Sequence, residues 1–178
     1  TGVPTVATLP MWREHGLPEE DGVFDDRGHA AGEVRLTIAI VAWPRISNLD
    51  EFQPLANIPG VHLRWVRSPA ELAGADWVIL PGSKHTTSDL AWLRAQGLDR
   101  AVAAHAGQGG RVLGICGGLQ MLGEALVDPH GIDGNAAGLG LLPLVTQFAR
   151  DKRLARAGKY TTAICAAATA SCAPRDSC

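Results

Sequence analysis

One cysteine stands between two apolar segments in the run Gly114-Ile115-Cys116-Gly117-Gly118-Leu119-Gln120. Residues 111–115, just before it, have the composition of a buried strand. The apolar residues that follow recur at helical spacing, namely Leu119, Met121, Leu122, Ala125 and Leu126. The pattern therefore predicts a strand-to-helix turn that carries Cys116.

A cysteine on such a turn has the setting of a catalytic nucleophile. Flanking glycines permit the strained backbone of a nucleophile elbow, which projects the side chain above the edge of the sheet. The first free N–H groups of the helix face the sulfur, and the helix dipole favours thiolate over thiol. The alternative is that Cys116 is a small buried apolar residue, as most free cysteines are. The turn alone leaves both interpretations open.

Length and composition indicate one α/β domain. Of the 178 residues, 46% are apolar and 19% are charged, which is enough to build one hydrophobic core. A net charge of −2 gives no reason to expect nucleic acid or an anionic membrane as a partner. No apolar run approaches the length of a membrane span, so we expect a cytoplasmic protein. Because Thr1 and the apolar residues after it look like a continuation, we also expect a piece of a longer protein.

Strands and helices are predicted to alternate along the middle of the chain. Strands are expected at residues 36–41, 61–66, 77–80 and 111–115, and helices at 51–56, from Ser68 onward, at 88–96 and at 98–106. Ser68-Pro69-Ala70-Glu71 has the spacing of a capping box with proline at the first helical position. The alternation is typical of an α/β fold, a flavodoxin-like, doubly wound, mostly parallel sheet with helices on both faces.

Sites in such sheets form beyond the carboxyl ends of the strands. Cys116 falls at one such end, and Pro81-Gly82-Ser83 falls at another. Attack of a thiolate on an amide creates an oxyanion, which needs N–H donors. The backbone N–H groups of Gly82 or Ser83 and of Gly117 are the candidates. The alternative for Pro81-Gly82 is an ordinary turn after a strand.

Longer stretches around these residues resemble a known family. The run from Gly114 to Gly123 is similar to the nucleophile motif of class I glutamine amidotransferases, which use a catalytic triad. Other stretches look like those of the cobyric acid synthase family, and the resemblance runs from about residue 3 to residue 148. These stretches are Leu9-Pro-Met-Trp12, Leu17-Pro-Glu-Glu-Asp21, Pro44-Arg-Ile-Ser-Asn48, Phe52-Gln-Pro-Leu55, Val78-Ile-Leu-Pro-Gly-Ser-Lys84, Asp89-Leu90, Leu93-Arg94 and Gly138-Leu-Gly-Leu-Leu142.

The resemblance implies a glutaminase domain that acts on L-glutamine. Cys116 would be the nucleophile, Gly82 or Ser83 together with Gly117 the oxyanion hole, and Gln120 a substrate-binding residue. In that family the ammonia passes to a separate synthetase domain, which uses ATP and Mg²⁺ to amidate a corrinoid, adenosylcobyrinic acid a,c-diamide. No Gly-x-x-x-x-Gly-Lys-[Ser/Thr] run occurs in these 178 residues. We therefore expect no cofactor and no metal in this chain.

The resemblance also implies three segments. Residues 1–33 would be the end of the synthetase domain and a linker, 34–148 a partial glutamine amidotransferase domain, and 149–178 a divergent tail, with the sheet truncated at its C-terminal end. The tail is rich in Ala, Thr, Ser and Cys and lacks sustained periodicity. The spacing of its cysteines, Cys165, Cys172 and Cys178, does not suit a zinc site. Disulfides are not expected in a cytoplasmic protein.

A general base is harder to find in this sequence. The family places its histidine in a Gly-Tyr-Glu-Ile-His type of segment downstream of the cysteine, and these 178 residues lack such a segment. The histidines present are His15, His29, His62, His85, His105 and His130. His85 follows the oxyanion loop, although a solvent-facing loop position is its commoner interpretation. Three alternatives stay open: the glutaminase of cobyric acid synthase, the glutaminase part of cobyrinate a,c-diamide synthase, and a non-catalytic or truncated glutaminase-like module.

Overall fold

The computed structural model describes residues 33–150 of the chain. Its elements in chain order are β1 (Leu36–Val41), β2 (Ile46–Ser47), the 3₁₀ helix η1 (Leu49–Phe52), α1 (Gln53–Ala56), β3 (Val61–Val66), α2 (Pro69–Leu72), β4 (Trp77–Leu80), β5 (Gly82–Ser83), α3 (Thr86–Ala95), α4 (Leu98–Gly107), β6 (Arg111–Gly114), α5 (Gly117–Leu122), β7 (Ala125–Val127), β8 (Ala136–Ala137) and β9 (Val145–Gln147). The domain boundaries at residues 33 and 148 stay predictions, since most of the two flanking segments lies outside the described residues.

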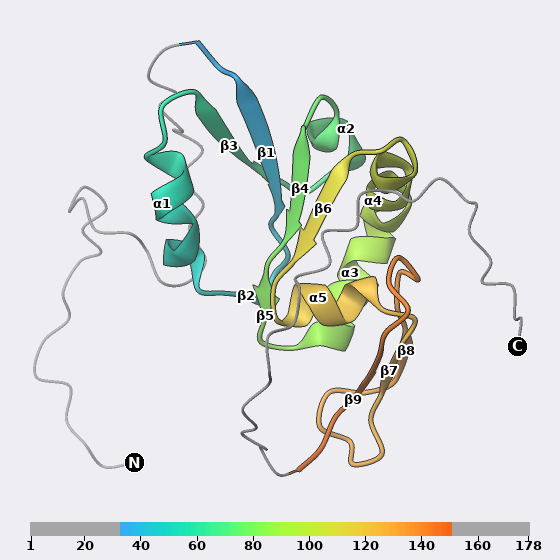
Figure 1. The fold of residues 1–178 in the computed structure, drawn as a ribbon. Coiled ribbons are helices and arrows are strands. Elements are labelled where there is room, and N and C mark those ends of the chain that lie inside the picture. Colours follow the sequence, from blue (N-terminus) through green and yellow to red (C-terminus); the bar gives the residue numbers. More distant parts are fainter. Residues whose placement is uncertain (1–32, 151–178) are drawn as a thin grey trace, which may run out of the picture.

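Four parallel strands form the central sheet, in the order β3-β1-β4-β6 (Figure 1). Numbered among themselves along the chain, these strands have the order 2-1-3-4, which matches four strands of the flavodoxin-like order 2-1-3-4-5. The predicted α/β fold class is confirmed. The bounds predicted for β1, β3 and β4 are also confirmed, because β1 and β4 are mostly apolar runs and β3 alternates apolar and polar residues.

Apolar side chains cover both faces of this sheet. On one face, a cluster from β1, β3 and β4 packs against η1 and α1, with Phe52 meeting Trp65 edge to face at 5.6 Å. On the other face, a larger cluster joins the sheet to α2, α3, α4 and α5. Figure 1 shows α1 beside β3 and the other helices grouped on the opposite side. Helices on both faces were predicted from the alternation, and the packing follows it.

Local signals placed the starts of α2 and α4 correctly. α2 begins with Pro69, and the Glu71 carboxylate accepts the Ser68 N–H at 3.0 Å, as the capping-box spacing predicts. α3 begins at Thr86, two residues earlier than expected. The segment predicted as one helix at 51–56 is a 3₁₀ turn followed by a short α-helix.

The helix after Cys116 is shorter than its apolar spacing predicts. α5 ends at Leu122, and Ala125 and Leu126 belong to strand β7, so the helical interpretation of those two residues was wrong. The chain leaves the helix at Gly123, whose backbone is extended. The segment 138–142 then supplies N–H groups to the last carbonyls of α5, including 2.9 Å bonds from Leu141 and Leu142 to Leu122. β7 pairs with β8 and β9 in a small separate sheet beyond α5 (Figure 1).

Candidate active site

Cys116 lies on a sharp turn between β6 and α5. Its backbone has φ 50° and ψ −112°, and its side chain is exposed. Among residues 33–150, Asn48 is the other non-glycine residue with positive φ. Such a conformation costs on the order of 1–3 kcal/mol and persists where the surrounding structure enforces it. The predicted strand-to-helix turn is therefore present, with the strained backbone that a nucleophile elbow requires.

Close contact with β4 enforces this turn. The Gly118 N–H lies 3.0 Å from the carbonyl oxygen of Pro81 and 2.8 Å from that of Ile115. A Cβ atom placed on Gly118 would lie 1.9 Å from the backbone oxygen of Leu80. Only glycine lets the start of α5 approach the end of β4 so closely. The two segments that the sequence placed at strand ends are thus in direct contact.

The segment after β4 is a short strand and not the ordinary turn that was the alternative. β5 pairs antiparallel with β2, matching Gly82 with Ser47 and Ser83 with Ile46. The Lys84 N–H donates to the Arg45 carbonyl at 2.8 Å. Pro81, which precedes β5, has no backbone N–H and so cannot serve as an oxyanion donor. The alternation of an antiparallel ladder makes Gly82 and Ser47 the hydrogen-bonded pair. The N–H of Gly82 is therefore used by β2, and the N–H of Ser83 points away from it.

Ser83 faces the elbow. A Cβ atom placed on Gly117 would lie 3.0 Å from the backbone nitrogen of Ser83 and 2.9 Å from its Cβ. The sequence left Gly82 and Ser83 as alternative donors beside Gly117. The free direction of the Ser83 N–H, together with its position against Gly117, favours Ser83.

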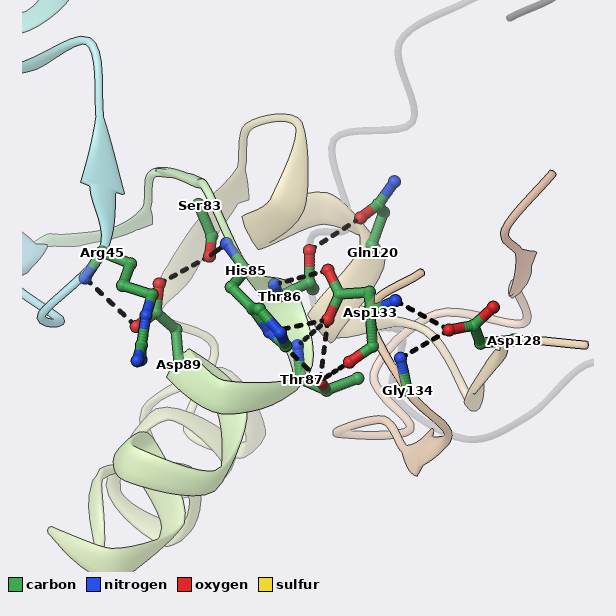
Figure 2. A network of polar contacts seen from close by, with 10 residues as sticks. All are labelled: Arg45, Ser83, His85, Thr86, Thr87, Asp89, Gln120, Asp128, Asp133 and Gly134. Atoms are coloured by element: carbon green, nitrogen blue, oxygen red, sulfur yellow. Dashed lines mark hydrogen bonds and ion pairs between the residues drawn. The ribbon is translucent and has the colours of Figure 1, made fainter. Parts of the chain in front are cut away.

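A buried carboxylate supports this loop from behind, as Figure 2 shows. Asp89, on α3, is 0% exposed. One of its oxygens accepts the Ser83 hydroxyl at 2.5 Å, and the other accepts the Arg45 backbone N–H at 3.2 Å. Burial raises the pKa of Asp89, and the hydrogen bonds from Ser83 and Arg45 offset this only in part.

The start of α3 is held by a residue from a distant loop. His85 occupies the N-cap position of α3 without a capping side-chain bond. Instead, the Asp133 carboxylate accepts the N–H groups of Thr86 and Thr87, both at 2.8 Å, and lies 3.1 Å from Nδ1 of His85 (Figure 2). Burial alone would raise the pKa of Asp133, but the donors from Thr87 and Thr86 outweigh it and lower the pKa.

Asp128 shapes the loop that delivers Asp133. Its carboxylate accepts the N–H groups of Asp133 and Gly134 at 2.7 Å each and that of His130 at 3.1 Å. Burial would raise the pKa of Asp128, but these backbone donors outweigh it and hold the pKa below its usual range. The loop that begins at Asp128 is therefore part of the support of α3.

Removal of the Asp133 carboxylate is expected to destabilise the fold. Asp133→Ala leaves the Thr86 and Thr87 N–H groups without their acceptor, which for a lost helix cap costs about 1–2 kcal/mol in free energy of unfolding. Because the folded-state pKa of Asp133 is lowered, its contribution is present above the unfolded carboxyl pKa of about 3.9 and is lost as pH falls through the folded value. Urea unfolding of both proteins at neutral and acidic pH measures this difference.

Glu124→Ala is the matched control for this measurement. Glu124 is exposed, and its side chain makes no hydrogen bond or ion pair within residues 33–150. Its removal should change the free energy of unfolding by no more than about 0.5 kcal/mol at either pH. Equal stability of Asp133→Ala and the parent chain at neutral pH would contradict the capping role.

Gln120 lies beside the start of α3. Its Oε1 accepts the Thr86 hydroxyl at 3.2 Å, and Figure 2 shows its amide nitrogen pointing away from Thr86. Thr86 is buried, and its Oγ1 would lie 3.3 Å from a Cβ placed on Gly117. The structure thus gathers Cys116, Gly117 and Gln120 of the elbow around the segment from Ser83 to Thr86.

The described histidines have local roles. The ring of His85 is 41% exposed and contacts Asp133 and Thr87. His105 places Nε2 3.2 Å from the Arg111 carbonyl oxygen, and His62 lies on β3. His15 and His29 lie outside the described residues.

Sequence reasoning missed Thr86, Asp89 and Asp133 as parts of the site. One signal was available for two of them. The buried face of α3 consists of Thr86, Asp89, Leu90 and Leu93, so a carboxylate and a hydroxyl interrupt an otherwise apolar stripe. A polar residue at a core position indicates a specific partner. Asp133 gave no such signal.

Between residues 33 and 150, no group of three or more His, Cys, Asp and Glu side chains is placed to hold a metal ion. In the same range, no helix has the length and apolarity needed to cross a bilayer.

Fold and site together define an α/β protein that carries a cysteine elbow at the carboxyl edge of a parallel sheet. A family model described as the CobB/CobQ-like glutamine amidotransferase domain matches residues 37–172. The chain belongs to this family.

Relatives and a solved structure agree with this assignment. The chain is 81% identical over 152 residues to cobyric acid synthase of Variovorax paradoxus (strain S110), which covers 85% of this chain and 32% of the relative. It is 80% identical over 151 residues to cobyric acid synthase of Polaromonas naphthalenivorans (strain CJ2), covering 83% of this chain and 31% of that one. The chain thus spans about a third of the length of these relatives. A crystal structure of a glutamine amidotransferase matches with a TM-score of 0.51 and 21% identity, covering 62% of this chain and 55% of the other, and shows the fold alone.

Proposed function

We propose that this chain hydrolyses L-glutamine as the glutaminase part of a cobyric acid synthase. The ammonia would serve the ATP- and Mg²⁺-dependent synthetase part of that enzyme, which amidates adenosylcobyrinic acid a,c-diamide in cobalamin biosynthesis. The names of the relatives support the substrate class. The observation that carries the proposal is the strained, exposed Cys116 turn packed against the backbone of Ser83.

In the proposed reaction, the Cys116 thiolate adds to the carboxamide carbon of glutamine. The carbonyl π electrons move to oxygen, and the N–H groups of Ser83 and Gly117 stabilise the resulting oxyanion. Collapse of this intermediate breaks the C–N bond, and the nitrogen takes up a proton and leaves as ammonia. Water then cleaves the γ-glutamyl thioester, which releases glutamate and regenerates the thiol.

Gln120 has a position that suits substrate binding. Thr86 donates to its oxygen, so the amide nitrogen is the free end of the side chain. An N–H donor beside the nucleophile can bind a polar group of the bound glutamine. We therefore assign to Gln120 the orientation of the substrate, with Thr86 as its support.

Labelling with a glutamine-mimicking electrophile tests the proposal. A diazo-ketone analogue of glutamine should modify Cys116 in preference to Cys165, Cys172 and Cys178, because Cys116 lies on the elbow at the start of α5. Excess L-glutamine should slow the labelling, whereas D-glutamine should not. Peptide mass spectrometry identifies the modified residue, and Cys116→Ala is the control. Preferential labelling of the tail cysteines, or no protection by L-glutamine, would reject the glutaminase assignment.

A further inference from the structure

A fully buried carboxylate, Asp89, lies directly behind the loop that faces Cys116. We propose that Asp89 is a positioning residue, which aims the backbone N–H of Ser83 at the oxyanion by binding the Ser83 hydroxyl and the Arg45 backbone together. This role rests on the proposed glutaminase function. It is carried by contacts separate from those of the nucleophile.

The side-chain bonds of Ser83 fix its place on β5. Its hydroxyl donates to one oxygen of Asp89 at 2.5 Å and accepts the His85 N–H at 3.1 Å. The hydroxyl is thus held between two groups at the start of α3. Since α3 packs its Leu90 and Leu93 into the main core, this anchor is rigid.

The second oxygen of Asp89 binds the backbone next to β2, the strand that pairs with β5. It accepts the Arg45 N–H at 3.2 Å, while the Arg45 carbonyl accepts the Lys84 N–H at 2.8 Å. Arg45 and Lys84 flank the short β2–β5 ladder. Asp89 therefore ties α3 to both strands of this ladder.

The peptide between Gly82 and Ser83 is also held from its carbonyl side. The indole N–H of Trp43, a residue 0% exposed, donates to the Gly82 oxygen at 3.1 Å. In a trans peptide the C=O and N–H groups point in opposite directions, so this bond turns the Ser83 N–H away from Trp43. Trp43 binds the carbonyl oxygen of this peptide, and Asp89 binds the side chain of Ser83. The peptide therefore has little freedom to rotate.

Burying a carboxylate at this position carries an energetic cost. Burial raises the pKa of Asp89, which means that the ionised form is disfavoured there. A leucine would fill the same stripe of α3, beside Leu90 and Leu93, without this cost. The Asp89 carboxylate is buried at an energetic cost and accepts hydrogen bonds from the Ser83 and Arg45 segments, which suits a positioning role better than a packing role.

The test compares two electrophiles on the full 178-residue chain at one pH. A diazo-ketone analogue of glutamine has a carbonyl that can occupy the oxyanion hole, whereas iodoacetamide alkylates the thiol without needing the hole. Loss of one oxyanion donor typically costs about 10²–10³ in rate. Asp89→Ala removes the group that orients the Ser83 N–H. We therefore expect it to lower the diazo-ketone rate at Cys116 by about tenfold or more and to change the iodoacetamide rate by less than about twofold.

Two more variants separate positioning from folding. Asp89→Asn keeps the size of the side chain and one acceptor, and should lose less of the diazo-ketone rate than Asp89→Ala. Asp99→Asn changes a carboxylate on α4, one oxygen of which is buried without a partner in residues 33–150. It should leave both rates unchanged. Melting temperatures of all variants show whether a rate loss comes from unfolding.

A double substitution tests the route through Ser83. If Asp89 acts through the Ser83 hydroxyl, Ser83→Ala should lower the diazo-ketone rate, and adding Asp89→Ala should lower it by less than about twofold further. If the ratio of the diazo-ketone rate to the iodoacetamide rate is the same in the parent chain and in folded Asp89→Ala, the positioning role of Asp89 is overturned, while the proposed function is not affected. Failure of the parent chain to be labelled at Cys116 would overturn the proposed function as well.

Discussion

Glutamine hydrolysis by these 178 residues is expected to be at least about 10²-fold slower than hydrolysis by the same chain extended with a Gly-Tyr-Glu-Ile-His-containing segment. General-base assistance contributes about 10²–10⁴-fold to such reactions. The elbow can supply the nucleophile, but thioester hydrolysis also needs a group that activates water. The family's histidine segment is missing from this sequence. Ammonia release from L-glutamine, measured for both polypeptides, gives the ratio of turnover rates.

An extension with alanine in place of its histidine is the control. It adds the same length of chain without the base, and its turnover should match that of the 178 residues. If the parent chain already equals the histidine-containing extension, a base exists within it. His85, whose Nδ1 lies 3.1 Å from Asp133, would then be the first residue to replace, because a paired carboxylate orients an imidazole for proton transfer.

Gly118→Ala is expected to reduce diazo-ketone labelling of Cys116 by about 10²-fold or more. The added Cβ would lie 1.9 Å from the Leu80 backbone oxygen, although such atoms do not approach closer than about 3.0 Å. The elbow must therefore move by about 1 Å, and a misplacement of that size at a reacting centre costs about 10² in rate. Labelling rates and urea unfolding curves, measured together, separate displacement of the elbow from loss of the fold.

Gly107→Ala is the matched substitution for this experiment. Gly107 is the last residue of α4, and a Cβ atom there would meet nothing within 4 Å. Alanine should stabilise the helix by roughly 0.5–1 kcal/mol and leave labelling unchanged. Wild-type labelling by Gly118→Ala would mean that the contact with Leu80 does not hold the nucleophile in place.

The strands and the elbow could be predicted because their signals are local. The parallel strands are short segments with either an apolar run or an alternation of apolar and polar residues, and glycines flank Cys116 within the motif itself. The extent of the helix after Cys116 was wrong because the spacing of Ala125 and Leu126 fits a helix as well as a strand. Gly123 ends that helix, and the carbonyls it leaves are bonded by residues 138–142, which the spacing of α5 could not reveal.

The support of the site could not be predicted, because most of its bonds join residues far apart in the chain. Asp89 and Arg45 are 44 residues apart, and Trp43 and Gly82 are 39 apart. A single sequence gives the polarity of each residue but not the partner it meets after folding. The choice between Gly82 and Ser83 depends on the register of β2 with β5, which is also a long-range property.

The bond from Asp133 to α3 has a consequence for the order of events during synthesis. Asp133 follows Thr86 by 47 residues, and a chain leaves the ribosome from its N-terminal end. The segment from β4 to most of α3 therefore emerges well before the Asp133 loop that caps α3. Until that loop arrives, the first turn of α3 has two amides with no acceptor, although it must support Ser83. The oxyanion side of the site is thus completed only after the cysteine itself has been made.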